Sequence, residues 1–186
     1  MNKTRSRMGA ALATMLGVAT FVVVVIILHL LQPGYEPRYQ LMSELALGPN
    51  GWAMLVAFSG LAIAILGLQA AIAKSGGSLG YRVLLLAVAM LVLAAGIFPL
   101  GAATLIHISA IAAAFVLSVL AMYLYPKNAG QASAAGPRAL SWPLAAGMAV
   151  SVAAGHAVVP MGIGQRLAAA CLIAWLAIVG WKLYRL

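Results

Sequence analysis

The feature that most constrains this chain is a series of long apolar stretches separated by short turns. A helix needs about 20 mainly apolar residues to cross a hydrocarbon core roughly 30 Å thick. Turn formers such as Gly48-Pro49-Asn50-Gly51 and Ser75-Gly76-Gly77 separate these stretches. The sequence therefore predicts one membrane domain, residues 1–186, with six spans at about residues 8–31, 52–73, 83–100, 102–125, 140–161 and 167–184.

The composition excludes an ordinary soluble domain, a disordered chain and a disulfide scaffold. Charged residues make up 7% of the chain and hydrophobic residues 65%, whereas soluble domains carry roughly a quarter charged residues. In lipid, backbone groups must find partners within the protein, so a chain crosses as helices or as a closed barrel. None of the apolar stretches alternates as barrel strands do. The expected fold class is all-α, a polytopic membrane protein.

The net charge of +9 is better explained by membrane topology than by nucleic-acid binding. The basic residues are scattered singly between apolar runs, so we expect no nucleic-acid partner. The positive-inside rule counts Lys and Arg near short loops. With both termini in the cytoplasm, nine basic residues fall inside and only Arg38 and Arg166 fall outside. This predicts a multi-pass protein of the inner (cytoplasmic) membrane, with both termini cytoplasmic.

The polar residues of the predicted spans gather near one face of the membrane. Each of the three histidines lies about one turn below the outer end of its span, and the remaining candidates lie in the outer loops or helix ends directly above. Ionisable groups within spans are costly and usually face a cavity or a partner. The candidate ligand-binding residues are therefore Ser43, Glu44, His107, His156, His29, Arg38 and Arg166.

Three interpretations of this polar layer stay open. The histidines hydrogen-bond to neighbouring helices or interfacial water, or they line a cavity for a lipid headgroup or small solute, or they hold a metal. Three imidazoles and a carboxylate suit zinc, although no pair has the spacing of a strong metal motif. The candidate metal ligands are His29, His107, His156 and Glu44.

Ser43 and Glu44 also suggest catalysis, because a serine, a histidine and an acid are the residue types of a nucleophilic hydrolase. Ser43 lacks the Gly-x-Ser-x-Gly context of a nucleophile elbow. The simpler alternative is that Ser43 caps a short helical turn while Glu44 pairs with Arg38 or Arg166. Because Ser43 and Glu44 lie among apolar neighbours, we expect residues 41–47 to dip toward the bundle and cover the histidine layer.

Two functions from different classes follow from these patterns. The first is an integral membrane protein, not an enzyme, whose outer polar layer binds a lipid, a small ligand or a partner subunit. Membrane lipid is the expected partner, and a homo-oligomer or a subunit of a larger complex is compatible with the pattern. The alternative is a membrane-embedded hydrolase acting on a lipid-linked substrate, with or without zinc. A transporter ranks third, because both carboxylates lie outside the spans.

Several different short motifs follow one another along the first four predicted spans. They are Pro33-Gly34-Tyr35-Glu36-Pro37, then Ser43-Glu44-Leu45-Ala46-Leu47-Gly48 followed by Gly51-Trp52, then Gly96-Ile97-Phe98-Pro99 and His107. In this order they resemble a bacterial and archaeal family of six-span membrane proteins, domain of unknown function nine hundred and ninety-eight. The resemblance implies that Ser43, Glu44, Pro99 and His107 are signature positions on one membrane face. It supplies no established activity.

The chain departs from that family's pattern at one place. The pattern often continues after the proline with a Thr-Asp pair, where this sequence has Leu100-Gly101 and a shortened turn. Any role that the resemblance assigns to that aspartate therefore has no residue to carry it here. The last two spans resemble the family only in their hydropathy.

Overall fold

The computed structural model describes residues 2–126 and 137–186, with the backbone alone described for residues 2, 3, 137 and 156. Within these ranges the chain forms long helices, one short 3-10 helix and no strand, which confirms the predicted all-α fold class. The elements are α1 (Asn2–Leu31), η1 (Met42–Leu47), α2 (Ala53–Lys74), α3 (Leu79–Ile97), α4 (Thr104–Tyr123), α5 (Pro137–Ala157) and α6 (Met161–Arg185).

Most of the long helices have the length and composition of membrane spans. Among the described residues, five helices meet both criteria: α1, α2, α3, α4 and α6. Helix α5 carries Arg138 and Pro143 in its first half and is not among them. The chain is therefore a helical protein with the apolar segments of a multi-pass membrane protein. The sixth span, the kind of membrane and the sidedness of the termini stay predictions.

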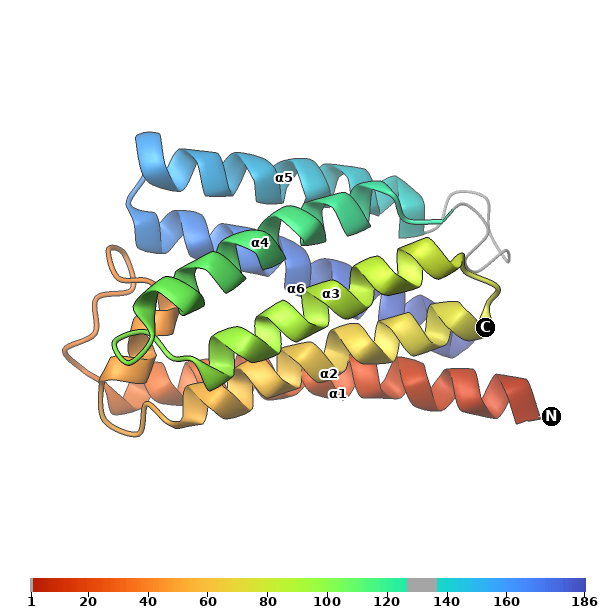
Figure 1. Ribbon diagram of the computed structural model, residues 1–186, viewed down its shortest axis with the longest axis horizontal. Coiled ribbons are helices and arrows are strands. Elements are labelled where there is room, and N and C mark those ends of the chain that lie inside the picture. The colour runs from red at the N-terminus through yellow and green to blue at the C-terminus, as the bar shows by residue number, and fades with distance from the viewer. Residues whose placement is uncertain (1, 127–136) are drawn as a thin grey trace.

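The helices run back and forth along one long axis (Figure 1). Both termini and the α2–α3 connection lie at one end of the bundle. The opposite end holds η1, the α3–α4 turn and the α5–α6 connection. We call this opposite end the η1 end; it comprises residues 32–52, 98–103 and 158–160. The grouping of alternate connections at opposite ends is the arrangement that the predicted spans require.

Helices α1 and α2 pack with their backbones almost in contact. A side chain at Gly17 of α1 would collide with the backbone of Gly60 and Ala64 in α2. A Cβ at Gly67 would lie 2.7 Å from the backbone of Ala10 and Thr14. Because lipid offers helices little hydrophobic reason to associate, such close approach through small residues is a main source of stability.

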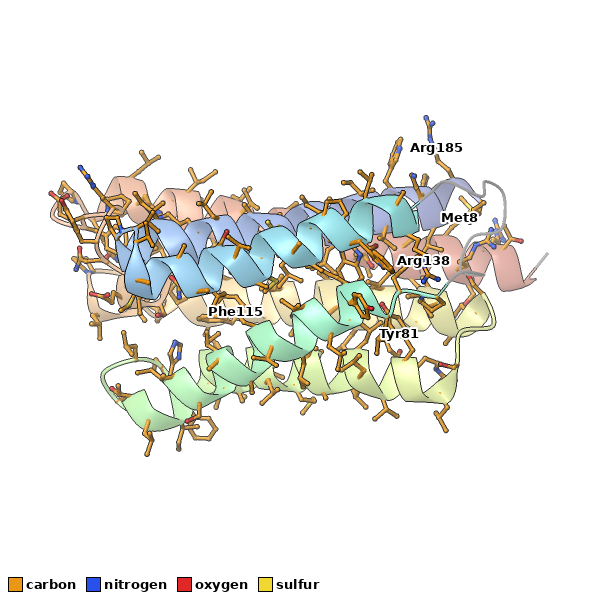
Figure 2. All side chains as sticks on the ribbon, turned by 90° about the horizontal axis from the view of Figure 1, so that it is seen from above. Met8, Tyr81, Phe115, Arg138 and Arg185 are labelled. Carbon is orange, nitrogen blue, oxygen red and sulfur yellow. The ribbon has the colours of Figure 1, made fainter. Side chains whose placement is uncertain are left out.

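Helices α4 and α5 are packed more loosely. Their contact is the least extensive of those between helices that follow one another in the chain. Seen from above, α4 and α5 diverge toward the η1 end, and Phe115 lies between them (Figure 2). This divergence places a hollow on the side of the bundle, near the residues predicted to form the polar layer.

The α5–α6 connection differs from its prediction. Helix α6 begins at Met161 rather than at about residue 167, and α5 ends at Ala157 rather than at about residue 161. Glycines such as Gly162 and Gly164 are typical of loops that reverse the chain. In the structure, however, both lie at the beginning of α6. Backbone atoms of the α1–α2 loop crowd Gly162, and those of α5 crowd Gly164, so a side chain would collide at either position. These glycines therefore serve close packing rather than chain reversal.

Candidate functional site

Gln32 anchors the α1–α2 loop to the bundle. It follows α1 directly and is buried, and its Nε2 donates to the carbonyl oxygens of Leu45 at 3.0 Å and Pro49 at 2.8 Å. Glu44 stabilises the start of η1, because its Oε1 accepts a hydrogen bond of 2.8 Å from the Leu41 N–H. Leu45 is fully buried against α1 and α2. The segment therefore dips into the bundle, as its apolar residues predicted.

Arg166 of α6 fastens the same loop from the other side. Its Nη1 donates to the carbonyl oxygens of Gln40 and Gly162, each at 2.9 Å. Its Nη2 donates to the hydroxyl of Tyr35 and to Nε2 of His29, the latter at 3.2 Å. We call Arg166, Tyr35 and His29 the arginine clasp. All four contacts are charge-assisted, which makes them stronger than neutral hydrogen bonds.

The hydrogen-bond geometry of the arginine clasp indicates where the protons of His29 and Tyr35 lie. Nδ1 of His29 lies 2.6 Å from the carbonyl oxygen of Val25, which only accepts, so Nδ1 carries the proton. Nε2 is then an acceptor and receives the Arg166 donor. Burial raises the pKa of the Tyr35 phenol above 10.0, and Arg166 opposes that rise through its hydrogen bond and its charge. Tyr35 is therefore neutral at physiological pH and donates to the Leu41 carbonyl at 2.8 Å.

A crevice of about 290 Å³ lies between α4 and α5 near the η1 end. Its walls are almost wholly apolar and include Ile108, Ile111 and Phe115 of α4 and Val152 of α5. Residues of η1 and of the first turns of α6 form its rim. No charged residue is among the described residues that line it. The crevice is thus an apolar slot, and the described polar side chains that line it are Ser43, His107 and Gln165.

His107 is the most unusual of these three. It is only 2% exposed, and its Nδ1 lies 2.8 Å from the carbonyl oxygen of Ala95 and 3.1 Å from that of Phe98. Because carbonyls only accept, Nδ1 carries a proton, and in a neutral imidazole Nε2 then holds a lone pair. That Nε2 is buried without a hydrogen-bond partner among the described residues. Leaving a buried acceptor unpaired costs about 1–3 kcal/mol.

Gln165 and Ser43 are also available to an occupant of the crevice. Oε1 of Gln165 accepts a hydrogen bond of 2.6 Å from the Met42 N–H, which orients the amide and leaves its NH2 group uncommitted. Ser43 is buried, and its hydroxyl makes no hydrogen bond to the described part of the chain. The crevice therefore offers an acceptor at His107, donors at Gln165 and a hydroxyl that serves as either.

The structure separates the predicted site residues into different environments. His29 and Arg166 belong to the arginine clasp, Ser43 and His107 line the crevice, and Glu44 holds η1. Arg38 is exposed, with its guanidinium 5.4 Å from the centre of the Tyr39 ring. His156 belongs to α5, but its side chain lies outside the described residues. The sequence reasoning missed Gln32 and Tyr35, although a glutamine at the very end of an apolar span was a usable signal.

The predicted zinc site is not assembled by the described side chains. They contain no group of three or more His, Cys, Asp or Glu residues that could hold a metal ion. Nε2 of His29 already receives the Arg166 donor, and both oxygens of Glu44 accept hydrogen bonds within the loop. Because the set also includes His156, zinc binding stays a prediction.

Comparison with known proteins identifies the family and gives no activity. No curated protein and no solved structure matches the chain. A family model described as "Protein of unknown function (DUF998)" matches residues 15–182. The match extends through α5 and α6, beyond the four spans that carry the short motifs. The chain therefore belongs to the DUF998 family of membrane-type proteins of unknown function.

Proposed function

We propose that this protein resides in the inner (cytoplasmic) membrane and binds a single lipid chain in the crevice between α4 and α5. The observation that carries the proposal is an apolar slot with three polar side chains at one end, of which His107 has a buried nitrogen without a partner among the described residues. Ligand sites typically combine mainly apolar walls with a few placed polar groups. A single-chain lipid matches this arrangement, because its apolar chain fits the apolar walls and its polar headgroup fits the polar side chains.

The crevice is accessible from the side of the bundle. Ile108, Ala112 and Met161 line it and are also exposed. A lipid chain can therefore enter directly from the surrounding hydrocarbon. The volume of about 290 Å³ lies at the lower end of the range for ligand pockets, which favours one chain over a two-chain lipid.

The proposed topology puts the crevice in the outer half of the membrane. Arg5, Arg7, Lys74, Arg82 and Arg185 belong to helix ends on the side of the termini, opposite the η1 end. Their placement supports cytoplasmic termini through the positive-inside rule. A chain inserted from the outer leaflet then reaches the crevice with its headgroup near η1.

The test is photolabelling of the purified protein in nanodiscs with a long-chain alcohol that carries a diazirine. We expect crosslinks to concentrate on the α4 and α5 residues that line the crevice. Ile108 and Ile106 offer a matched pair, because each is 50% exposed on α4 but only Ile108 lines the crevice. Ile108→Trp is expected to lower crevice labelling about tenfold, an effect equivalent to roughly 1.4 kcal/mol of affinity, and Ile106→Trp to leave it unchanged.

Two results would overturn the proposal. One is labelling spread evenly over all the lipid-facing helices, which would show that the crevice is no preferred site. The other is an equal effect of the two tryptophan variants, which would show that filling the crevice does not exclude the chain.

A second candidate function is hydrolysis of a lipid-linked ester. One observation favours it: Ser43 and His107 line the same crevice, and Nε2 of His107 is in the form that accepts a proton. It ranks second because Nδ1 of His107 faces backbone carbonyls rather than an orienting carboxylate. Free fatty acid released from a monoacylglycerol, and lost in both Ser43→Ala and His107→Ala, would establish it. Intact monoacylglycerol after prolonged incubation would exclude it.

A further inference from the structure

We propose that the crevice selects a neutral, hydroxyl-bearing headgroup, such as that of a monoacylglycerol, over a carboxylate or a phosphate. This inference rests on the proposed lipid binding and concerns which class of single-chain lipid is held. It depends on the hydrogen-bonding character of the three polar side chains and on the charges that surround them.

His107 supplies an acceptor to the crevice. Its Nδ1 proton is directed at the carbonyls of Ala95 and Phe98, at the end of α3. The two nitrogens lie on different sides of the imidazole ring, so Nε2 points away from α3. His107 lines the α4–α5 crevice, which has no α3 residue in its lining, and also a second cavity of about 300 Å³ on the α3 side, which includes Ala95 and Gly96. Because Nδ1 is directed at the α3 carbonyls, we assign Nε2 to the α4–α5 crevice, where it requires a donor.

Gln165 and Ser43 supply the complementary groups. The Met42 N–H fixes the Gln165 oxygen, so only the amide N–H groups remain for an occupant. The Ser43 hydroxyl donates or accepts as required. A headgroup with two hydroxyls matches this set, because one hydroxyl donates to Nε2 of His107 while oxygens of the headgroup accept from Gln165 and Ser43.

The charges around the crevice disfavour an anionic headgroup. No lysine or arginine is among the described lining residues. Arg166 follows Gln165 directly, but its guanidinium is committed to Gln40, Gly162, Tyr35 and His29. A carboxylate would therefore meet the lone pair of His107 without a neutralising cation, and burying an unpaired charge is far more costly than burying a hydroxyl.

The test is competition against the diazirine alcohol in nanodiscs at pH 8, with monoolein, oleate and oleoyl lysophosphatidic acid as competitors. These competitors carry the same chain and differ in their headgroups. We expect monoolein to halve the labelling of the crevice at a concentration about tenfold below that of oleate or the lysophospholipid. Two variants should abolish this preference: His107→Phe, which removes the acceptor, and Gln165→Glu, which keeps an oxygen for Met42 but removes the donors. Gln69→Leu on α2, outside the crevice lining, is the control that should preserve it.

The outcomes separate this inference from the proposed function. Equal competition by monoolein and oleate would overturn the headgroup selectivity, while localised labelling by the alcohol would still support the lipid site. Labelling that is neither localised nor reduced by any competitor would overturn both. A preference for monoolein that survives in Gln165→Glu would also contradict the inference. If His107→Phe does not fold, the wild-type order and Gln165→Glu carry the test.

Discussion

Two histidines near the η1 end share a local arrangement and differ in one contact. In both His29 and His107, Nδ1 lies within hydrogen-bond distance of a backbone carbonyl, so Nε2 is the free acceptor. Arg166 fills that acceptor in His29, whereas nothing described fills it in His107. The difference teaches that residue type and depth do not identify a binding site in a bundle like this. The informative property is whether the hydrogen-bonding capacity is used up.

The two regions that contain these histidines differ in the same way. The arginine clasp joins the α1–α2 loop to α6 through a guanidinium that bonds four acceptors. The crevice has three polar side chains inside apolar walls, and one of them, His107, has a buried nitrogen without a described partner. A saturated network rigidifies a structure, whereas an unpaired buried polar group is costly until a partner binds it. The clasp therefore contributes to stability, and the crevice is where we propose binding.

The strongest test of this comparison is removal of the Arg166 guanidinium. Arg166→Met keeps an unbranched apolar side chain but leaves the Gln40 carbonyl, Tyr35 and His29 without their common partner. We expect a loss of about 3 kcal/mol in the free energy of unfolding, because hydrogen bonds to charged groups are among the strongest single contributions. Thermal or chemical unfolding in detergent micelles measures it.

Arg38→Met is the matched control, because Arg38 is exposed in the same loop. Surface substitutions usually change stability by less than about 0.5 kcal/mol. Equal effects of the two substitutions would show that the clasp contributes nothing beyond an ordinary surface arginine.

A second test concerns the backbone contact beneath the clasp. A Cβ at Gly162 would lie within 2.8 Å of the carbonyl oxygens of Pro37, Arg38 and Gln40. Gly162→Ala is therefore expected to lift the loop and destabilise the protein by about 2 kcal/mol through overpacking. Gly80 occupies the same position in α3, second in its helix, and a Cβ there would meet nothing within 4 Å. Unfolding curves should show Gly80→Ala unchanged or slightly stabilised, and a similar loss in both variants would refute the tight loop contact.

The smallest expected effect extends the comparison to two buried hydroxyls. Ser141 is fully buried and accepts a hydrogen bond of 2.9 Å from Nε1 of Trp175. Ser118 is 1% exposed, and its Oγ has no partner among the described residues. Ser141→Ala should cost about 1 kcal/mol because the Trp175 N–H loses its acceptor, while Ser118→Ala should be neutral or stabilising. The reverse order in denaturation experiments would mean that hydrogen-bond saturation does not distinguish these sites.

The fold was largely predictable from hydropathy, because a hydrocarbon environment forces each long apolar stretch to satisfy its own backbone. The predicted all-α class is confirmed, and so is the family suggested by the loop motifs. Helix α6 begins at Met161, ahead of the predicted span at about residues 167–184, because Gly162 and Gly164 look the same in sequence whether they reverse the chain or allow close packing. Only the three-dimensional contacts separate these two uses of glycine.

The depth of the polar residues along the bundle was predictable from the sequence, but their separation into the arginine clasp and the crevice was not. Hydropathy places His29 and His107 near the ends of their spans, and the structure places both near the η1 end. Hydropathy could not show that Arg166 hydrogen-bonds to His29, a contact across 137 positions of the chain. Pairing of this kind depends on how each helix is rotated about its axis and on the path of the loop, which the apolar pattern does not record.

The near-contact of Gly17 in α1 with Gly60 in α2 also has a consequence for motion. Where main chains touch, no side chain stands between them that can change rotamer, so α1 and α2 cannot slide or separate without breaking the contact outright. Widening of the slot between α4 and α5 therefore needs no rearrangement of the α1–α2 pair.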